Sequence, residues 1–94
     1  MSHSSAAFGM LRWAGSRIAA MTGNLEHALD LADRAYEIGR THGDASIEAL
    51  GLMYRGFYRL CLGNTRDGLT DQDHAGALAL SRKLDPLTGA ALYC

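Results

Sequence analysis

The sequence has few of the β-branched residues that favour strands and little proline, the residue that most strongly interrupts helices. It contains no valine and a single proline, Pro86, in 94 residues. Strands are enriched in β-branched and aromatic residues, whereas alanine and leucine, which are frequent in this chain, have high helix propensity. We therefore expect an all-α protein.

Other absences argue against whole classes of protein. A formal net charge of −1 provides no basic excess of the kind that binds nucleic acid. No apolar run approaches the roughly 20 residues that cross a membrane, and the polar start does not resemble a secretory signal. Two cysteines, Cys61 and Cys94, are too few for a disulfide framework. We expect a cytoplasmic protein with no direct contact to nucleic acid or membrane, in which Cys61 is a small buried residue.

Glycine followed by a helix-capping residue recurs at regular intervals. The pairs are Gly23-Asn24, Gly43-Asp44 and Gly63-Asn64. Glycine accepts the left-handed conformation that ends a helix, and Asn or Asp caps the free N–H groups of the next one. The spacing predicts four helices, near 5–22, 25–42, 45–62 and 66–82, with a fifth starting at Pro86 after the cap Asp85.

The chain also partly matches itself at an offset of 40 residues. Identical residues at this offset are Gly23/Gly63, Asn24/Asn64, Leu29/Leu69, Asp33/Asp73 and Ala35/Ala75. A period of this length built from paired helices indicates an α-solenoid. We expect one domain over residues 1–94, with units near 5–43 and 45–83 and a third beginning at 85–94. The third helix is apolar nearly all round and should lie in the middle.

Two segments resemble the central turn of a tetratricopeptide repeat. They are residues 62–69, Leu-Gly-Asn-Thr-Arg-Asp-Gly-Leu, and residues 22–29, Thr-Gly-Asn-Leu-Glu-His-Ala-Leu. The long units and the segment 84–94 resemble the repeat regions of large bacterial LuxR-type transcriptional regulators and of related ATPase or cyclase signalling proteins. The resemblance implies an α-α superhelix of antiparallel helix pairs. Arg55 and Arg59 depart from the tetratricopeptide pattern, because they occupy positions where the repeat usually has apolar residues.

In such a solenoid the first helix of each unit lines a concave groove. The first and third helices carry four arginines against Glu48 alone, and they also supply large apolar side chains of the types enriched at interface cores. Our candidates for a partner-binding groove are Trp13, Arg17, Leu50, Met53 and Phe57. The competing interpretation is that these side chains pack against neighbouring repeats.

Nothing in the sequence assembles into a catalytic or metal site. The four histidines contain no pair at i, i+4 spacing, so we expect no metal. The run from Asp71 to His74 spreads around a helix, and we interpret it as a solvated first turn. An acidic strip on the second helix should likewise be solvated, with ion pairs Asp30–Arg34 and Glu37–Arg40 across one turn; its acids are Glu26, Asp30, Asp33 and Glu37.

These observations favour a non-catalytic, cofactor-free scaffold that binds a protein or peptide, as part of a bacterial transcriptional regulator or signalling protein. The alternative is a structural spacer or oligomerisation segment with no ligand of its own. Leu87, Leu92 and Tyr93 begin a fifth helix that stops early, so the fourth helix should expose an apolar face. Because exposed apolar patches find partners, we also expect a homo-oligomer to form through the ends of the solenoid.

Overall fold

The chain forms four helices, seen in a computed structural model that describes the backbone of residues 3–81 and the side chains of residues 7–81. The helices are α1 (His3–Met21), α2 (Leu25–His42), α3 (Ala45–Cys61) and α4 (Thr65–Ser81). Residues 3–81 contain no strand, so the all-α prediction is confirmed, with helix ends within a few residues of those expected. The fifth helix predicted at Pro86 lies outside the described residues.

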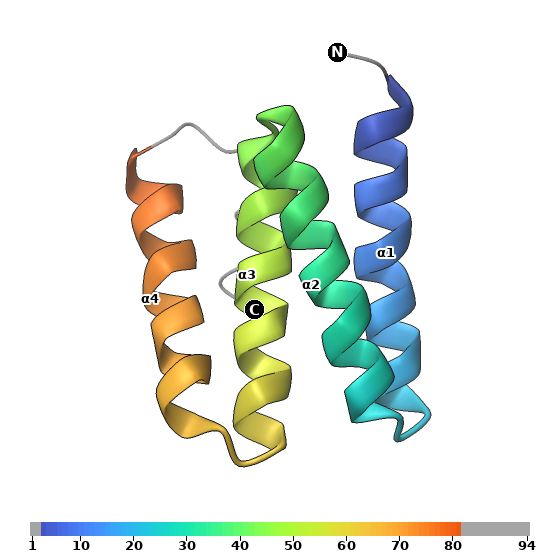
Figure 1. Ribbon diagram of the computed structural model, residues 1–94, viewed down its shortest axis with the longest axis vertical. Coiled ribbons are helices and arrows are strands. Elements are labelled where there is room, and N and C mark those ends of the chain that lie inside the picture. Colours follow the sequence, from blue (N-terminus) through green and yellow to red (C-terminus); the bar gives the residue numbers. More distant parts are fainter. Residues whose placement is uncertain (1–2, 82–94) are drawn as a thin grey trace.

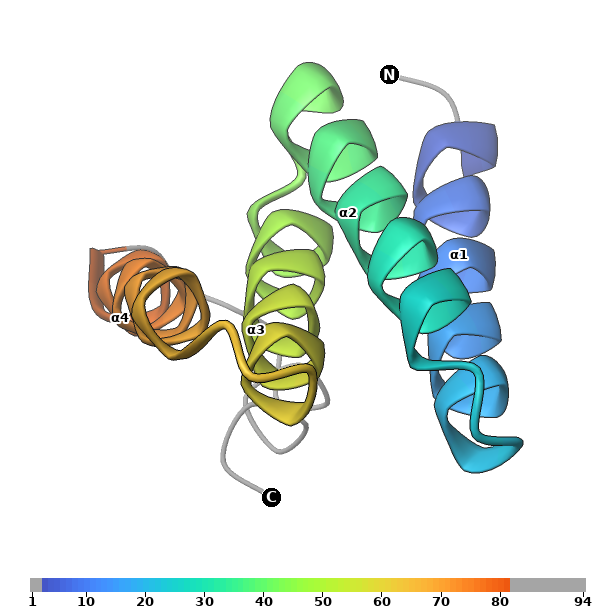
Figure 2. The ribbon, with the colours of Figure 1, turned by 60° about the horizontal axis from the view of Figure 1, so that its bottom comes forward.

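The helices stand in a row in the order of the chain (Figure 1). The turns after α1 and α3 lie at the bottom of this view, and the turn after α2 lies at the top, so neighbouring helices run antiparallel. The same order appears from a second direction, in which α4 and α1 occupy opposite sides (Figure 2). Helix α3 packs against α2, α4 and also α1, which confirms its predicted place in the middle.

Glycine and a capping residue form the turns as expected. Gly23, Gly43 and Gly63 have φ of 86°, 71° and 90°, a region that other residues rarely adopt. Asn24 caps α2 by accepting a hydrogen bond from the backbone N–H of His27, at 3.2 Å. Asp44 caps α3 in the same way through Ile47, also at 3.2 Å. These two predicted caps are confirmed.

The first and third turns have equivalent hydrogen bonds at the 40-residue offset. The backbone N–H of Asn24 donates to the carbonyl of Ala19 at 2.9 Å, and that of Asn64 donates to the carbonyl of Arg59 at 2.8 Å. The two hairpins therefore share the geometry of their turns as well as their sequence. They differ in the cap, because the Asn64 side chain donates to the Asp67 carboxylate at 3.1 Å.

Glycines allow the central helices to approach at backbone distance. A Cβ on Gly51 would overlap the backbone N and Cα of Tyr36 in α2, and a Cβ on Gly39 would overlap the backbone of Glu48 in α3. A Cβ on Gly56 would lie 2.6 Å from the carbonyl oxygen of Gly68 in α4. Contacts this short leave no room for any side chain, so these glycines set the spacing of the row.

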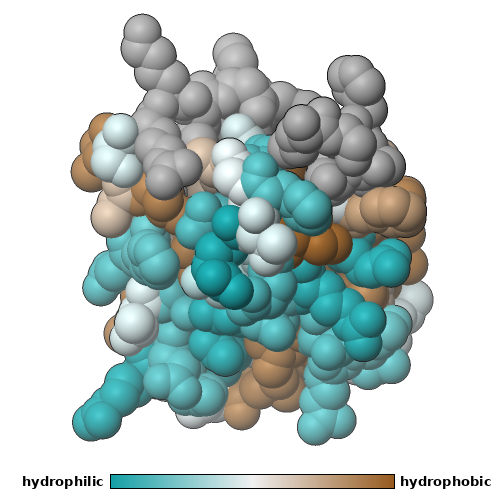
Figure 3. All heavy atoms as spheres, turned by 45° about the horizontal axis from the view of Figure 1, so that its top comes forward, coloured by the Kyte–Doolittle hydropathy of each residue, from teal (hydrophilic) through white to brown (hydrophobic). Residues whose placement is uncertain are grey.

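Small and aromatic side chains fill the space between the helices. One cluster joins Ala49 and Leu52 of α3 to Ala75 and Leu78 of α4. A second joins Tyr58 of α3 to small residues of α1 and α2, which are Ala19, Ala28 and Ala32. On the outside, hydrophobic side chains form separate patches among hydrophilic ones (Figure 3). The core is thus divided into separate clusters between the helices. Other large apolar side chains remain exposed on the surface.

The close approach of α2 and α3 predicts opposite outcomes for two glycine-to-alanine substitutions. Gly51→Ala should lower the free energy of unfolding by about 1–3 kcal/mol, because its methyl group displaces the α2 backbone. Gly76→Ala, at a helical position with no neighbour within 4 Å, should raise it by about 1 kcal/mol through helix propensity. Urea unfolding in dilute solution measures both. Equal changes in the free energy of unfolding for the two variants would contradict the contact between Gly51 and the α2 backbone.

Candidate interaction surface

Four aromatic side chains form a continuous cluster where α1 meets α3. The ring centroids of Trp13 and Tyr54 are 5.6 Å apart in an edge-to-face arrangement. Tyr54 and Tyr58 follow at 6.2 Å, and Phe57 meets Tyr58 edge-to-face at 5.7 Å. Such pairs contribute about 0.5–1.5 kcal/mol beyond their burial. We call these four residues, together with Arg17, the aromatic face.

The aromatic face has a buried base and an exposed rim. Tyr58 is fully buried, and its hydroxyl lies 3.2 Å from that of Ser16 in α1. Burial raises the pKa of the Tyr58 phenol above its usual value, since water no longer stabilises the anion. Phe57 is 45 % exposed. Arg17 is also exposed, with its guanidinium carbon 5.1 Å from the centre of the Tyr54 ring. This cation–π contact holds a charge at the edge of the cluster.

Trp13 carries an unusual polar atom within this face. Its Nε1–H is buried, and within the described part of the chain it has no hydrogen-bond partner. An unpaired buried donor costs about 1–3 kcal/mol. Among the described residues, the indole N–H therefore lacks a hydrogen-bond acceptor at the junction of α1 and α3.

The five predicted groove residues separate into two groups. Trp13, Arg17 and Phe57 belong to the aromatic face. Leu50 is 1 % exposed and so presents nothing to a partner, while Met53 packs against the cluster between α3 and α4. Tyr54 and Tyr58, which join the first three residues, were not among the candidates. The apolar spacing of the third helix includes both tyrosines, and it does not reveal which side of the helix faces α1.

A network of ion pairs links α2, α3 and α4. The Arg55 guanidinium donates two hydrogen bonds to Asp71 of α4, at 2.9 and 2.8 Å, and one to Asp33 of α2, at 2.6 Å. Arg59 donates to the same Asp71 carboxylate at 2.7 Å. Arg55 also lies over the Tyr36 ring, 4.6 Å from its centre. The bonds to Asp71 raise the pKa of Arg55 above its ordinary value despite the opposing effect of burial.

This network corrects two predictions about charged residues. Asp71 was expected in a solvated first turn, yet it is 5 % exposed because two arginines surround it. The acidic strip of α2 was expected to face solvent throughout, but Asp33 contacts Arg55. Arg55 and Arg59 thus contribute paired charge rather than apolar packing where α3 faces α2 and α4.

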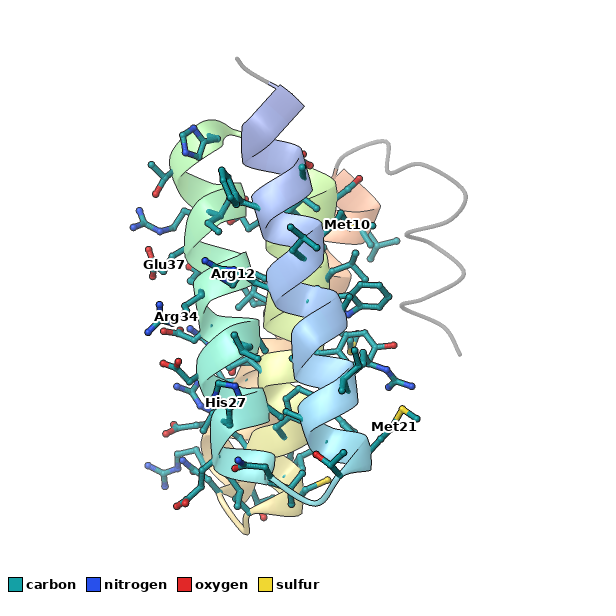
Figure 4. The ribbon with its side chains drawn as sticks, turned by 90° about the vertical axis from the view of Figure 1, so that its right-hand side faces the viewer. Met10, Arg12, Met21, His27, Arg34 and Glu37 are labelled. Atoms are coloured by element: carbon teal, nitrogen blue, oxygen red, sulfur yellow. The ribbon has the colours of Figure 1, made fainter. Side chains whose placement is uncertain are left out.

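Other predictions about α2 and α3 have mixed outcomes. The pairs Asp30–Arg34, at 2.9 Å, and Glu37–Arg40, at 2.6 Å, are confirmed, and Arg34 and Glu37 lie along the outer side of α2 (Figure 4). The prediction that Cys61 is buried is wrong, because this thiol is exposed in the last turn of α3.

A shallow cleft of about 290 Å³ opens beside the ion-pair network. Glu26, Leu29, Asp30 and Asp33 line it from α2, and Arg55 and Arg59 from α3. Both arginines already bind aspartates, so the cleft offers little unpaired charge from that side. Across residues 3–81, no three His, Cys, Asp or Glu side chains gather in a geometry that could hold a metal ion. Within the same range, none of the helices has both the length and the apolar character needed to cross a bilayer.

Comparisons with protein-family models, with curated proteins and with solved structures each found no match.

The buried carboxylate at the centre of the network gives a matched pair of substitutions. Asp71→Asn leaves Arg55 and Arg59 without their shared anion and should lower the free energy of unfolding by about 3 kcal/mol. Asp73→Asn removes the same charge two residues away at an exposed position and should change it by less than about 0.5 kcal/mol. Chemical unfolding of both variants tests this expectation. Similar losses for the two would mean that Asp71 is not buried among cations.

Proposed function

We propose that this chain is a non-catalytic helical-repeat scaffold that binds another protein through the aromatic face. The observation that carries the proposal is the assembly of Trp13, Arg17, Tyr54 and Phe57 at one junction, with Arg17 and Phe57 open to solvent. Trp, Tyr and Arg dominate binding energy at protein interfaces. Their packing against one another limits the side-chain entropy that a partner's arrival would cost.

The chemistry of this face favours an acidic partner segment with an aromatic or large apolar residue. Arg17 presents a cation that a carboxylate can pair with, and Phe57, which is linked to it through Tyr54 and Tyr58, offers an exposed apolar ring. We therefore propose a peptide or domain surface with an acid close to an aromatic residue.

The resemblance to tetratricopeptide repeats supports the broader setting of this proposal. The glycine-cap turns and the equivalent hydrogen bonds of the two hairpins suit a unit that is repeated to extend a binding surface. We propose that the chain serves as such a surface in a cytoplasmic bacterial regulator or signalling protein.

The competing proposal is a spacer or oligomerisation segment with no ligand of its own. It gains support from the apolar side chains that α1 and α4 leave exposed. A spacer would not need a cation at the edge of an aromatic cluster. Binding to the aromatic face therefore separates the two proposals.

Intrinsic fluorescence can test the proposal directly, because Trp13 is the chain's single tryptophan. Peptides from a pool that combines acidic and aromatic residues should shift its emission on binding. Arg17→Glu and Phe57→Ala should each raise the Kd of the selected peptide at least about tenfold, equivalent to about 1.4 kcal/mol of binding free energy. Trp13 itself is left intact as the probe.

Two variants on α4 serve as matched controls for this titration. Arg66→Glu makes the same charge change at an exposed position, and Leu69→Ala truncates a side chain as exposed as Phe57. Both should bind the peptide like the unsubstituted chain. The proposal fails if no peptide in the pool shifts the emission, or if Arg17→Glu and Arg66→Glu weaken binding equally.

A further inference from the structure

Ser16 of α1 forms a buried hydroxyl link to the aromatic face. Its Oγ donates a hydrogen bond to the backbone carbonyl of Trp13 at 2.6 Å and lies 3.2 Å from the Tyr58 hydroxyl. Both hydroxyl-bearing side chains are fully buried. A serine hydroxyl has a single proton, and a backbone carbonyl can only accept. The Tyr58 O–H therefore donates to Ser16, and Ser16 donates in turn to Trp13.

The link lies directly beside the contacts that assemble the aromatic face. Trp13, Ser16 and Arg17 stand at positions i, i+3 and i+4 of α1, which share one side of a helix. On α3, Tyr54 and Tyr58 lie one turn apart. Trp13 and Arg17 both contact the Tyr54 ring, and Ser16 contacts Tyr58. The hydrogen bond thus joins the two helices one turn of α3 away from the ring contacts.

The hydrogen bond tolerates less movement than the ring contacts do. Sliding α1 by one residue along its axis displaces it by about 1.5 Å. Ring pairs remain favourable over centroid separations of about 4.5–7 Å, so Trp13 and Tyr54, at 5.6 Å, would stay in contact. The two hydroxyls, at 3.2 Å, would pass out of hydrogen-bond range. Because both are buried, water would not replace the lost partner.

The repeat pattern does not supply this link. The residue 40 positions after Ser16 is Gly56, which has no hydroxyl. Gly56 instead lets α3 approach the backbone of α4 at Gly68. The hydroxyl pair is therefore particular to the contact between α1 and α3.

We infer that Ser16 and Tyr58 are the positioning residues of the aromatic face, because their hydrogen bond fixes α1 along α3 and so holds Trp13 and Arg17 against Tyr54. Both act from beneath the face and need not touch a partner. Without the bond, α1 occupies other positions, and the Kd of a partner rises as the fraction of chains with an assembled face falls. This effect on Kd rests on the proposed function, whereas the positioning does not.

Removing one hydroxyl at a time tests the hydrogen bond. Ser16→Ala leaves the buried Tyr58 O–H without its acceptor and should lower the melting temperature, despite the higher helix propensity of alanine. Tyr58→Phe leaves Ser16 bonded to the Trp13 carbonyl and should lower it less. Adding Tyr58→Phe to Ser16→Ala removes the unpaired hydroxyl, so the double variant should melt above Ser16→Ala alone. Losses that simply add in the double variant would overturn the inference.

Near-ultraviolet circular dichroism reports the position of Trp13 without any partner, because Trp13 is the chain's single tryptophan. Tyr58→Phe should weaken the tryptophan band while the far-ultraviolet spectrum is unchanged, since the ring stays and only the bond is lost. The matched control is Tyr36→Phe, which removes the same hydroxyl from α2, outside the aromatic face, and should leave the band as it is. An unaltered band in Tyr58→Phe, or equal weakening in Tyr36→Phe, contradicts the positioning role.

Peptide titration separates this inference from the proposed function. Tyr58→Phe should raise the Kd of the selected acidic-aromatic peptide at least about threefold, although Tyr58 is buried, and Tyr36→Phe should leave it unchanged. If no peptide binds the unsubstituted chain, the proposed function fails, while melting and dichroism still decide the positioning. If a peptide binds and Tyr58→Phe leaves its Kd unchanged, the inference is overturned and the proposed function stands.

Discussion

The contact of two helix backbones at Gly39 and Gly51 is the constraint on which the other features of this fold depend. Each glycine lies against the main chain of the opposing helix, at Glu48 and at Tyr36. Because backbone cannot yield as a side chain can, the separation and the relative position of α2 and α3 are determined at two points along their length. From this fixed pair, α1 extends the row on one side and α4 extends it on the other.

The ion-pair network is a consequence of that spacing. With α2 held close, Arg55 reaches Asp33 and the Tyr36 ring while its other nitrogens bind Asp71 on α4. Buried ion pairs often add little net stability, but removing one partner is costly. The main effect of the network is therefore to raise the free energy of any arrangement in which α3 shifts relative to α2 or α4. Gly56 and Gly68 keep α4 near enough for Asp71 to be enclosed by the two arginines.

Local features of the fold were predictable because they depend on residues close in sequence. The turns follow from Gly23, Gly43 and Gly63, and the helix composition excludes strands. What the sequence could not reveal is which polar residues find partners far along the chain. Arg55 donates hydrogen bonds to Asp71, sixteen residues away in the sequence, and to Asp33, twenty-two residues away. Periodicity alone does not tell whether an aspartate faces solvent or an arginine.

The candidate surface was partly predictable for the same reason. Trp13, Arg17 and Phe57 are of residue types that suit an interface, and they do lie on the aromatic face. Leu50 has the same helical period but points into the core, since a helix that is apolar nearly all round gives no signal of which side is covered. Tyr54 connects the aromatic face through contacts with α1 that depend on how the two hairpins pack.

Hydrogen exchange of the individual backbone amides tests the central claim, that α3 is the fixed element around which the row is built. The close glycine contacts and the ion-pair network predict that amides of residues 50–58 exchange only through global unfolding, with the slowest rates in the chain. The outer helices, each covered on fewer sides, should exchange sooner through local opening. Exchange of residues 50–58 as fast as that of α1 and α4 would contradict this account.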